Sequence, residues 1–316
     1  MTRIALVGLG LVGRAWAVSY ARAGYDVALF DEKPEAADAA LRFAEEAARS
    51  LAAEGLLGDS TPEEVLTRLH RAASLEAALE GAEYVQESTF EDLEVKRAVY
   101  ARLDAAAAPE TVLASSTSAI LPSKFSEGLE GRARCLVAHP INPPYLIPVV
   151  EIVPAPWTEP AAIARTSAIL KGAGHAPVVM KREIDGFLVN RLQGALLEEA
   201  FRLVAEGYAG VEDIDACLRE GLALRWSFMG PFETIDLNAP GGVRDYARRY
   251  EPMYEAMTRD LAGRRADWSG PAMDEIEAER RALTPASDLA ARQLWRDRRL
   301  MALLAHKREA AKTHGE

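Results

Sequence analysis

Cysteine is scarce in this sequence of 316 residues, which contains Cys135 and Cys217 far apart along the chain. Two distant cysteines do not make a disulfide framework. The five histidines form no ligand-spaced cluster with them, so we expect no metal site. We therefore interpret both cysteines as residues of the protein core.

Basic tracts and long apolar runs are also missing. The net charge is −11, without a cluster of basic and aromatic residues, which argues against nucleic acid or an anionic membrane surface as the main partner. No apolar run approaches the ~18 residues that a membrane span needs, and the N-terminus enters a strand within a few residues. We therefore expect a cytoplasmic protein, long enough for two domains, in which an anionic substrate would require a local cationic residue.

Glycines near the N-terminus are the most informative residues that are present. Gly8, Gly10 and Gly13 follow the apolar run IALV and precede a helical segment. In a βαβ unit the first glycine makes the tight turn, the second lets a pyrophosphate approach the backbone, and the third permits close packing of helix on strand. The phosphates then meet N–H groups at the start of the helix. We predict a dinucleotide site here, with Leu11 and Val12 between the last two glycines.

The second predicted strand adds a carboxylate to this site. The segment YDVALFD ends at Asp31, 18 residues beyond Gly13, where a partner for the ribose 2′-hydroxyl of the cofactor is expected. A carboxylate at that position favours NAD and repels the additional phosphate of NADP. A glycine turn in an unrelated α/β protein is the alternative, and the combination of strand, glycines, helix and acid makes it the weaker one.

Strands and helices alternate in the N-terminal part of the chain. Residues 34–73 are rich in Ala, Glu, Leu and Arg, which predicts two helices joined by a turn at 55–61. Alternation of this kind is typical of a parallel sheet covered by helices. We therefore predict an α/β fold with an N-terminal Rossmann-type, doubly wound, mainly parallel sheet. The predicted strands lie within residues 4–7, 25–31, 81–89, 110–118, 134–139, 147–153 and 176–181.

The strand pattern stops near residues 181–186, where the charged segment REIDG follows the last predicted strand. We place a domain boundary there. Residues 1–183 are predicted to form the NAD-binding domain, and residues 184–316 a mainly α-helical C-terminal domain for the substrate and for dimerisation. The stretch that follows Gly186 has its apolar residues on one helical face, which supports a helix there.

Several separated motifs resemble the 3-hydroxyacyl-CoA dehydrogenase superfamily. In HPINPP, His139 is followed three residues on by Asn142 and twelve residues on by Glu151. The glycine loop, EDLEVK, SSTS and DGFLVNRL occur in the order typical of that superfamily, so that the resemblance covers nearly the whole chain. HPINPPYLIPVVEIVP and RWSFMGPFETIDLNA are similar to the lambda-crystallin branch, whose enzymatic member is L-gulonate 3-dehydrogenase. The resemblance also implies a homodimer through the C-terminal domain.

The chemistry of alcohol oxidation gives His139 a role that does not depend on the resemblance. The oxidation removes a hydride from carbon and a proton from oxygen, and because NAD accepts the hydride, the protein must accept the proton. Histidine titrates nearest neutrality, so we predict that His139 is the general base. The resemblance assigns Glu151 to the other ring nitrogen, where a carboxylate fixes the tautomer and stabilises the imidazolium. A structural histidine at a strand end is the alternative.

Further site residues follow from the resemblance alone. Ser118 and Asn190 would reach the reacting oxygen and the nicotinamide from the two domains, which implies an active site in the cleft between them. Asn142 would contact the substrate, or would only make the turn of its loop. Glu91 and Lys96 would contact the cofactor near the ribose and the nicotinamide, or would form an ordinary ion pair on a helix surface.

The identity of the substrate rests on fewer residues. A small carboxylate requires a cation in the site, and Arg225 in LALRWSFMG is our candidate, because a guanidinium can bind a carboxylate through two hydrogen bonds. A surface or interface arginine is the alternative. The leading hypothesis is NAD-dependent oxidation of a free 3-hydroxy acid, L-gulonate, at C3.

Four alternatives to L-gulonate oxidation stay open. L-Carnitine is one, since Trp226 and Phe228 could hold its quaternary ammonium group, and a 3-hydroxyacyl-CoA or 3-hydroxybutyrate is another. A structural protein similar to the lambda-crystallins and an NADH-binding module without turnover belong to a different functional class. The intact pair of His139 and Glu151 argues against both of these non-catalytic alternatives.

Overall fold

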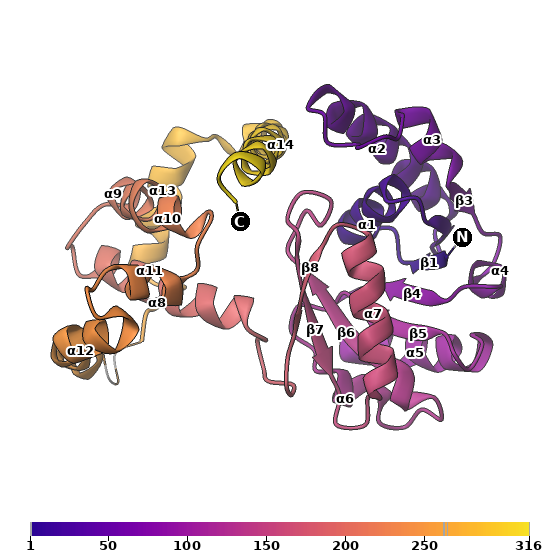
Figure 1. Cartoon of the computed structure of the whole chain (residues 1–316), viewed down its shortest axis with the longest axis horizontal. Helices are drawn as coiled ribbons and strands as arrows, with labels where there is room; N and C mark the ends of the chain where they lie inside the picture. The colour runs from indigo at the N-terminus through magenta and orange to yellow at the C-terminus, as the bar shows by residue number, and fades with distance from the viewer. Residues whose placement is uncertain (1, 262, 264, 316) are drawn as a thin grey trace. The chain divides into compact units, whose positions relative to one another are not determined.

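A computed structural model describes residues 2–261, 263 and 265–315. The chain divides into two compact units, an α/β unit and a helical unit (Figure 1). Together they confirm the predicted fold class, a mainly parallel sheet followed by a helical C-terminal part. Unit 1 comprises Met1–Val189 and Asp297–Ala305, and unit 2 comprises Asn190–Arg296 and His306–Glu316.

An eight-stranded sheet forms the centre of unit 1 (Figure 1). Its strands are β1 (Arg3–Val7), β2 (Asp26–Phe30), β3 (Leu69–Arg71), β4 (Tyr84–Glu87), β5 (Val112–Ser115), β6 (Cys135–Pro140), β7 (Val149–Pro154) and β8 (Ala176–Val179). The spatial order is β3-β2-β1-β4-β5-β6-β7-β8. Since this order reverses at β1, the carboxyl ends of β1 and β4 border the switch point at which α/β sheets bind ligands.

Helices of unit 1 pack on both faces of the sheet. The described residues of unit 2 form helices and no strand. Consecutive residues of β1 show the two faces, because Ile4 and Leu6 join one buried cluster and Ala5 and Val7 join the other. The helices are α1 (Leu11–Arg22), α2 (Pro34–Ala53), α3 (Pro62–Thr67), α4 (Leu75–Leu79), α5 (Leu93–Ala106), α6 (Pro122–Ser126), η1 (Arg132–Arg134), α7 (Pro160–Gly172), α8 (Val189–Ala205), α9 (Val211–Ala216), η2 (Cys217–Leu222), α10 (Ala223–Trp226), α11 (Pro231–Leu237), α12 (Gly242–Leu261), α13 (Pro271–Leu283), η3 (Ala286–Asp288) and α14 (Leu289–His314).

The last helix, α14, contributes to both units. Its middle segment, Asp297–Ala305, belongs to unit 1. There Met301 is buried in the same apolar cluster as the side chains of α1 and α2, and Leu300 and Leu304 pack against that cluster. The core of unit 1 therefore includes a side chain from close to the C-terminus. No helix within the described ranges is long and apolar enough to cross a membrane.

Two predictions from the sequence are wrong. Residues 69–71 lie within the stretch predicted to be helical, but they form the edge strand β3, which pairs with β2; three residues are too few for a strand pattern to appear among helix formers. Cys135 is buried, as predicted, whereas Cys217 is exposed. Val211 at the start of α9 is buried, and Cys217 lies six residues on, about 240° further around a helix, so that it faces away from the core.

Candidate active site

The loop between β1 and α1 has the geometry that a dinucleotide requires of three glycines. Gly8 has a φ of +88°, and a Cβ on it would meet the carbonyl group of Ser88 at 2.7 Å. A Cβ on Gly13 would lie 1.9 Å from the carbonyl oxygen of Gly8, whereas a Cβ on Gly10 would meet nothing within 4 Å. The loop is therefore closed on the protein side and open at its middle glycine. Gly10 is also the N-cap of α1 and forms no side-chain cap there, so that the N–H groups of the first turn, at Leu11 and Val12, can bind phosphate oxygens.

Asp31 holds this loop from the end of β2. One carboxylate oxygen accepts the N–H of Leu9 at 2.7 Å and the other accepts the N–H of Lys33 at 2.9 Å. Beside it lies a pocket of about 440 Å³ with mostly apolar walls. A pocket of this size and lining at the switch point suits the adenosine part of a dinucleotide. The pocket is lined by Val7, Gly8, Leu9, Gly10, Phe30, Asp31, Glu32, Lys33, Ala36, Leu75, Ser88, Thr89, Phe90, Val95, Val99 and Arg102.

His139 and Glu151 face each other across the antiparallel strands β6 and β7. The two residues are register partners, and His139 Nδ1 lies 2.7 Å from a carboxylate oxygen of Glu151. Both are buried, His139 with 4% and Glu151 with 0% of its surface exposed. The ring of Phe187 lies 5.4 Å from the imidazole between centroids. A buried imidazole that is held through Nδ1 keeps its Nε2 for chemistry.

The second carboxylate oxygen of Glu151 is engaged by backbone groups. It accepts the N–H of Leu188 at 2.7 Å and the N–H of Val189 at 2.9 Å. These groups follow a turn in which Gly186 and Phe187 have φ values of 77° and 50°. Burial by itself raises the pKa of Glu151, but the hydrogen bonds from His139 and from these two N–H groups outweigh it, so the pKa is lowered. The carboxylate is thus charged, and it favours the tautomer of His139 that has its proton on Nδ1.

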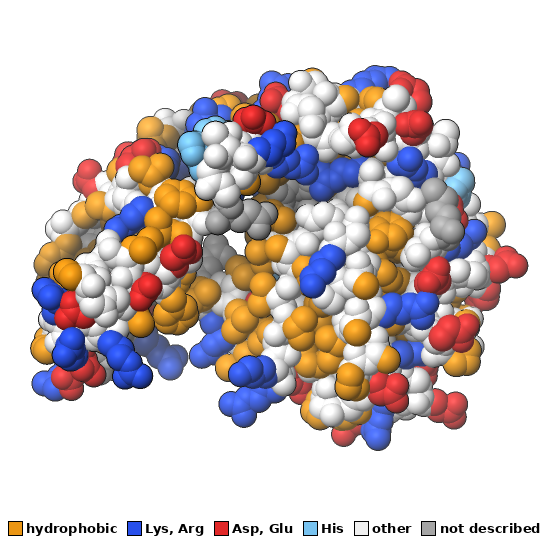
Figure 2. Space-filling view, viewed as in Figure 1, with side chains coloured by type: hydrophobic (Ala, Val, Ile, Leu, Met, Phe, Trp, Pro, Cys, Tyr) orange, Lys and Arg blue, Asp and Glu red, His pale blue; other side chains and the backbone are white. Residues whose placement is uncertain are grey.

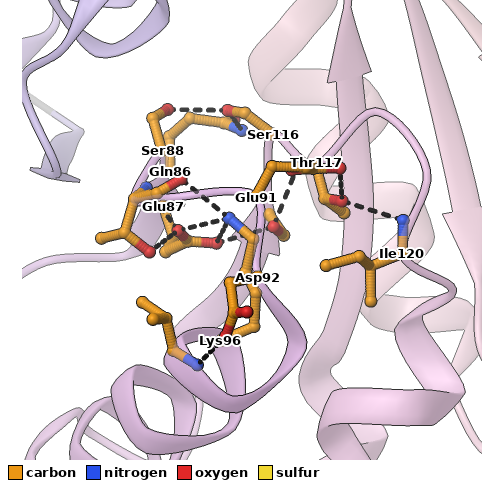
Figure 3. Close-up of polar contacts among 12 residues, drawn as sticks. Gln86, Glu87, Ser88, Glu91, Asp92, Lys96, Ser116, Thr117 and Ile120 are labelled. Atoms are coloured by element: carbon orange, nitrogen blue, oxygen red, sulfur yellow. Dashed lines mark hydrogen bonds and ion pairs between the residues drawn. The ribbon is translucent and has the colours of Figure 1, made fainter.

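A buried ion pair that the sequence analysis missed lies at the end of β4 (Figure 3). Lys96 Nζ is 2.8 Å from a carboxylate oxygen of Glu87 and 3.2 Å from the carbonyl oxygen of Thr89. Glu87 also accepts the hydroxyl of Ser115 at 2.6 Å. Lys96 is only 1% exposed, and its ammonium joins Glu87 to the backbone of the loop after β4. The cofactor contact that the resemblance implies for Lys96 stays a prediction. A carboxylate at the end of an apolar strand, nine residues before a lysine, is the signal that could have indicated Glu87.

Glu91 connects the loops that follow β4 and β5 (Figure 3). One of its carboxylate oxygens accepts the hydroxyl of Thr117 at 2.5 Å, the N–H of Ser118 at 2.9 Å and the N–H of Ala119 at 3.0 Å. The side chain of Glu91 is exposed, as is Ser118. Glu91 therefore holds the backbone of the loop after β5, which carries Ser118, in place.

The remaining predicted residues lie elsewhere in the chain. Asn142 is exposed in the loop between β6 and β7. Asn190, near the start of α8, and Arg225, in α10, belong to unit 2, and Arg225 is exposed. Unit 1 thus brings together the glycine loop with Asp31, and His139 with Glu151. Within the described ranges, no group of three or more His, Cys, Asp or Glu residues could hold a metal ion.

Two family models together match most of the chain. Residues 3–184 match the NAD-binding domain of 3-hydroxyacyl-CoA dehydrogenase, and residues 186–268 match its C-terminal domain. The chain belongs to the 3-hydroxyacyl-CoA dehydrogenase family. It is an NAD-dependent hydroxy acid dehydrogenase, and the glycine loop with Asp31 fits that cofactor.

Relatives with similar sequences and structures support the same branch. A lambda-crystallin homolog from Bos taurus is 43% identical over 97% of this chain and 96% of its own length. L-Carnitine dehydrogenase from Pseudomonas putida is 33% identical over 98% of this chain and 95% of its own length. The crystal structure of 5-formyl-3-hydroxy-2-methylpyridine 4-carboxylic acid 5-dehydrogenase, an NAD⁺-dependent dismutase, superimposes with a TM-score of 0.82 at 28% identity, covering 96% of this chain and 97% of that chain. The resemblance to the lambda-crystallin branch is confirmed.

Proposed function

We propose that this dehydrogenase oxidises the 3-hydroxyl group of a free hydroxy acid, L-gulonate, with His139 as the general base. The pairing of His139 with Glu151 carries the proposal, because a buried, oriented imidazole is the group that alcohol oxidation requires. L-Gulonate is the substrate of the enzymatic member of the lambda-crystallin branch, and lambda-crystallins are among the most similar relatives of this chain.

The proton path follows from the contacts of the imidazole. The substrate hydroxyl donates its proton to His139 Nε2 while the adjacent C–H bond breaks and a carbonyl forms. Bound NAD supplies the hydride acceptor. The Nδ1 proton of His139 stays on the ring and is hydrogen-bonded to the charged Glu151, which stabilises the imidazolium. Ser118, Asn142 and Asn190 are proposed to orient the reacting oxygen and the acid.

L-Carnitine is the second candidate substrate. L-Carnitine dehydrogenases from two Streptomyces species are 39% and 41% identical over 84% and 79% of this chain, respectively. Trp226 and Phe228 are exposed side chains of unit 2, and aromatic rings are the groups that recognise a quaternary ammonium. Arg225 directly precedes Trp226 in the sequence, and its guanidinium is proposed to bind the carboxylate that L-gulonate and L-carnitine share.

A substrate panel tests the proposal. With NAD, kcat/KM for L-gulonate is expected to exceed the values for L-carnitine, L-3-hydroxybutyrate and a 3-hydroxyacyl-CoA by about tenfold or more, as pockets that match polar groups discriminate strongly. Formation of NADH is the measurement. Arg225→Ala should raise KM for the acid and leave KM for NAD unchanged, with Arg219→Ala, an exposed arginine on η2, as the matched control. A preference for L-carnitine or the CoA ester would contradict the assignment of L-gulonate and leave the role of His139 intact.

We also propose that the chain forms a homodimer through unit 2. Its helices expose large apolar side chains, and Figure 2 shows hydrophobic side chains on the surface of both units. Exposed apolar patches of this kind mark interaction surfaces. We expect a sedimenting species of twice the 34.4 kDa chain mass, shifted toward the monomer by serine substitutions in the patch. A wild-type chain that sediments as a monomer would contradict the proposal. The patch consists of the exposed side chains of Leu224 on α10 and of Phe232 and Leu237 on α11.

A further inference from the structure

A buried hydrogen-bond network lies below the loop that follows β4, separate from the His139–Glu151 pair. At its centre is the hydroxyl oxygen of Ser116, which lies 3.1 Å from Trp16 Nε1, 2.7 Å from Gln86 Nε2 and 2.8 Å from the hydroxyl oxygen of Ser88. Figure 3 shows Ser88 and Ser116 pointing toward each other from the ends of neighbouring strands. Trp16 comes from α1, the helix that begins at the glycine loop. The network therefore joins three segments at the dinucleotide pocket.

The orientation of the Gln86 amide is fixed by its other neighbours. Its oxygen accepts the hydroxyls of Tyr20 at 3.1 Å and Tyr84 at 2.9 Å. Burial raises the pKa of both tyrosines, so each phenol keeps its proton and donates it. The amide nitrogen also donates to the carbonyl oxygen of Ala138 at 3.3 Å. A reversed amide would place two oxygens in contact, so the nitrogen of Gln86 faces Ser116.

The two nitrogen donors determine where the proton of Ser116 points. An indole N–H and an amide N–H can only donate, and a hydroxyl oxygen has two lone pairs. With Trp16 and Gln86 donating to it, Ser116 donates its own proton to Ser88. The Ser88 hydroxyl thus accepts this bond, and its proton is left for another acceptor. In the part of the chain that the structure describes, Ser116 is the one hydrogen-bond partner of the Ser88 side chain.

Ser88 lies on the wall of the pocket, where a bound ligand can accept the proton of its hydroxyl group. It lines the pocket together with Gly8 and Gly10, and a Cβ on Gly13 would lie 3.5 Å from the Cβ of Ser88. We infer that Ser88 donates a hydrogen bond to an oxygen of the bound dinucleotide beside the glycine loop. Trp16, Gln86 and Ser116 are then positioning residues that fix the direction of this donor. The inference requires the binding of NAD and is independent of which hydroxy acid is oxidised.

Binding of NADH to Ser88→Ala tests the donor without any turnover. We expect the Kd of NADH, measured by fluorescence, to rise by about tenfold, the effect of losing one hydrogen bond to a polar or charged group. ADP-ribose, which keeps the phosphates and lacks the nicotinamide, should lose affinity by the same factor. Ser126→Ala is the matched control, since this buried hydroxyl on α6 bonds to Pro122 and Trp157 outside the network. An unchanged Kd for NADH, or a loss restricted to NADH, would overturn the inference.

A double-mutant cycle tests the positioning residues. Ser116→Ala is expected to weaken NADH binding several-fold in the wild-type background and to have no further effect in the Ser88→Ala background, because its contribution passes through the Ser88 hydroxyl. Melting temperatures without ligand show whether any variant has lost its fold. Equal losses of affinity in both backgrounds would show that Ser116 only supports packing, and would contradict the assigned direction of the Ser88 proton.

Discussion

Replacing His139 with alanine is expected to lower kcat for alcohol oxidation by about 10³-fold, because general base catalysis typically contributes 10²- to 10⁴-fold and no neighbouring group would occupy its position. His139 is buried against Glu151 and Phe187 in unit 1, whereas the glycine loop that binds NAD is formed by other segments. The Kd of NADH should therefore stay within about threefold of wild type. Steady-state kinetics and NADH fluorescence measure the two quantities.

A matched control for this substitution is available in His70→Ala. His70 is an exposed residue of the edge strand β3, where its ring pairs with Asp26 at the surface, and surface pairs of this kind contribute little to stability. This variant should keep wild-type kcat. A His139→Ala enzyme that retains more than about a tenth of wild-type kcat would show that another group accepts the proton.

Gly13→Ala is expected to abolish NADH binding, with Kd raised by at least about 100-fold, and to lower the melting temperature. The added Cβ would lie 1.9 Å from the backbone oxygen of Gly8, a distance that no rotamer change can relieve, so that α1 must move away from β1. A displacement of about 1 Å at a binding site is enough for an effect of this size. Calorimetric melting and NADH titration give the two readouts.

Gly10→Ala is expected to change NADH affinity without changing the stability of the fold. A Cβ there meets nothing within 4 Å, and a φ of −66° suits alanine, so the melting temperature of the ligand-free protein should not change. NADH binding should still weaken, because the open side of Gly10 is where the pyrophosphate approaches. Gly128→Ala, with equally free space and far from the loop in sequence, should change neither quantity. If Gly13→Ala binds NADH like wild type, the loop is not the cofactor site.

The parts of the site that could be predicted from the sequence are formed by residues that lie close together along the chain. Gly8, Gly10 and Gly13 lie within one turn and the following helix, and their steric reasons are visible in the order of residues. His139 and Glu151 are twelve residues apart on strands joined by a short loop, so the antiparallel pairing that aligns them needs little else of the fold.

Other contacts depend on segments that only the folded chain brings together. Glu87 contacts Ser115 because β4 and β5 are neighbours in the sheet, and it contacts Lys96 because α5 packs beside the end of β4. No pattern in the sequence predicts which strands and helices are neighbours in this way. Glu91 could be identified as a functional candidate, but its three contacts to the loop after β5 could not. The strand β3 depends on pairing with β2 across the whole length of α2 and α3.

The chain crosses between the two units three times, and the second crossing, which returns it to unit 1 at Asp297, restricts the order in which the protein can fold. Domains normally fold from the N-terminus during synthesis on the ribosome. Here Met301, a buried member of the unit 1 core, comes from residues 297–305. The cofactor-binding unit therefore completes its core only after residues 297–305 have been translated. A nascent chain that stops at Val189 would leave the apolar surface that Met301 covers exposed to solvent, so the unit that binds the cofactor cannot complete its core from its own contiguous residues.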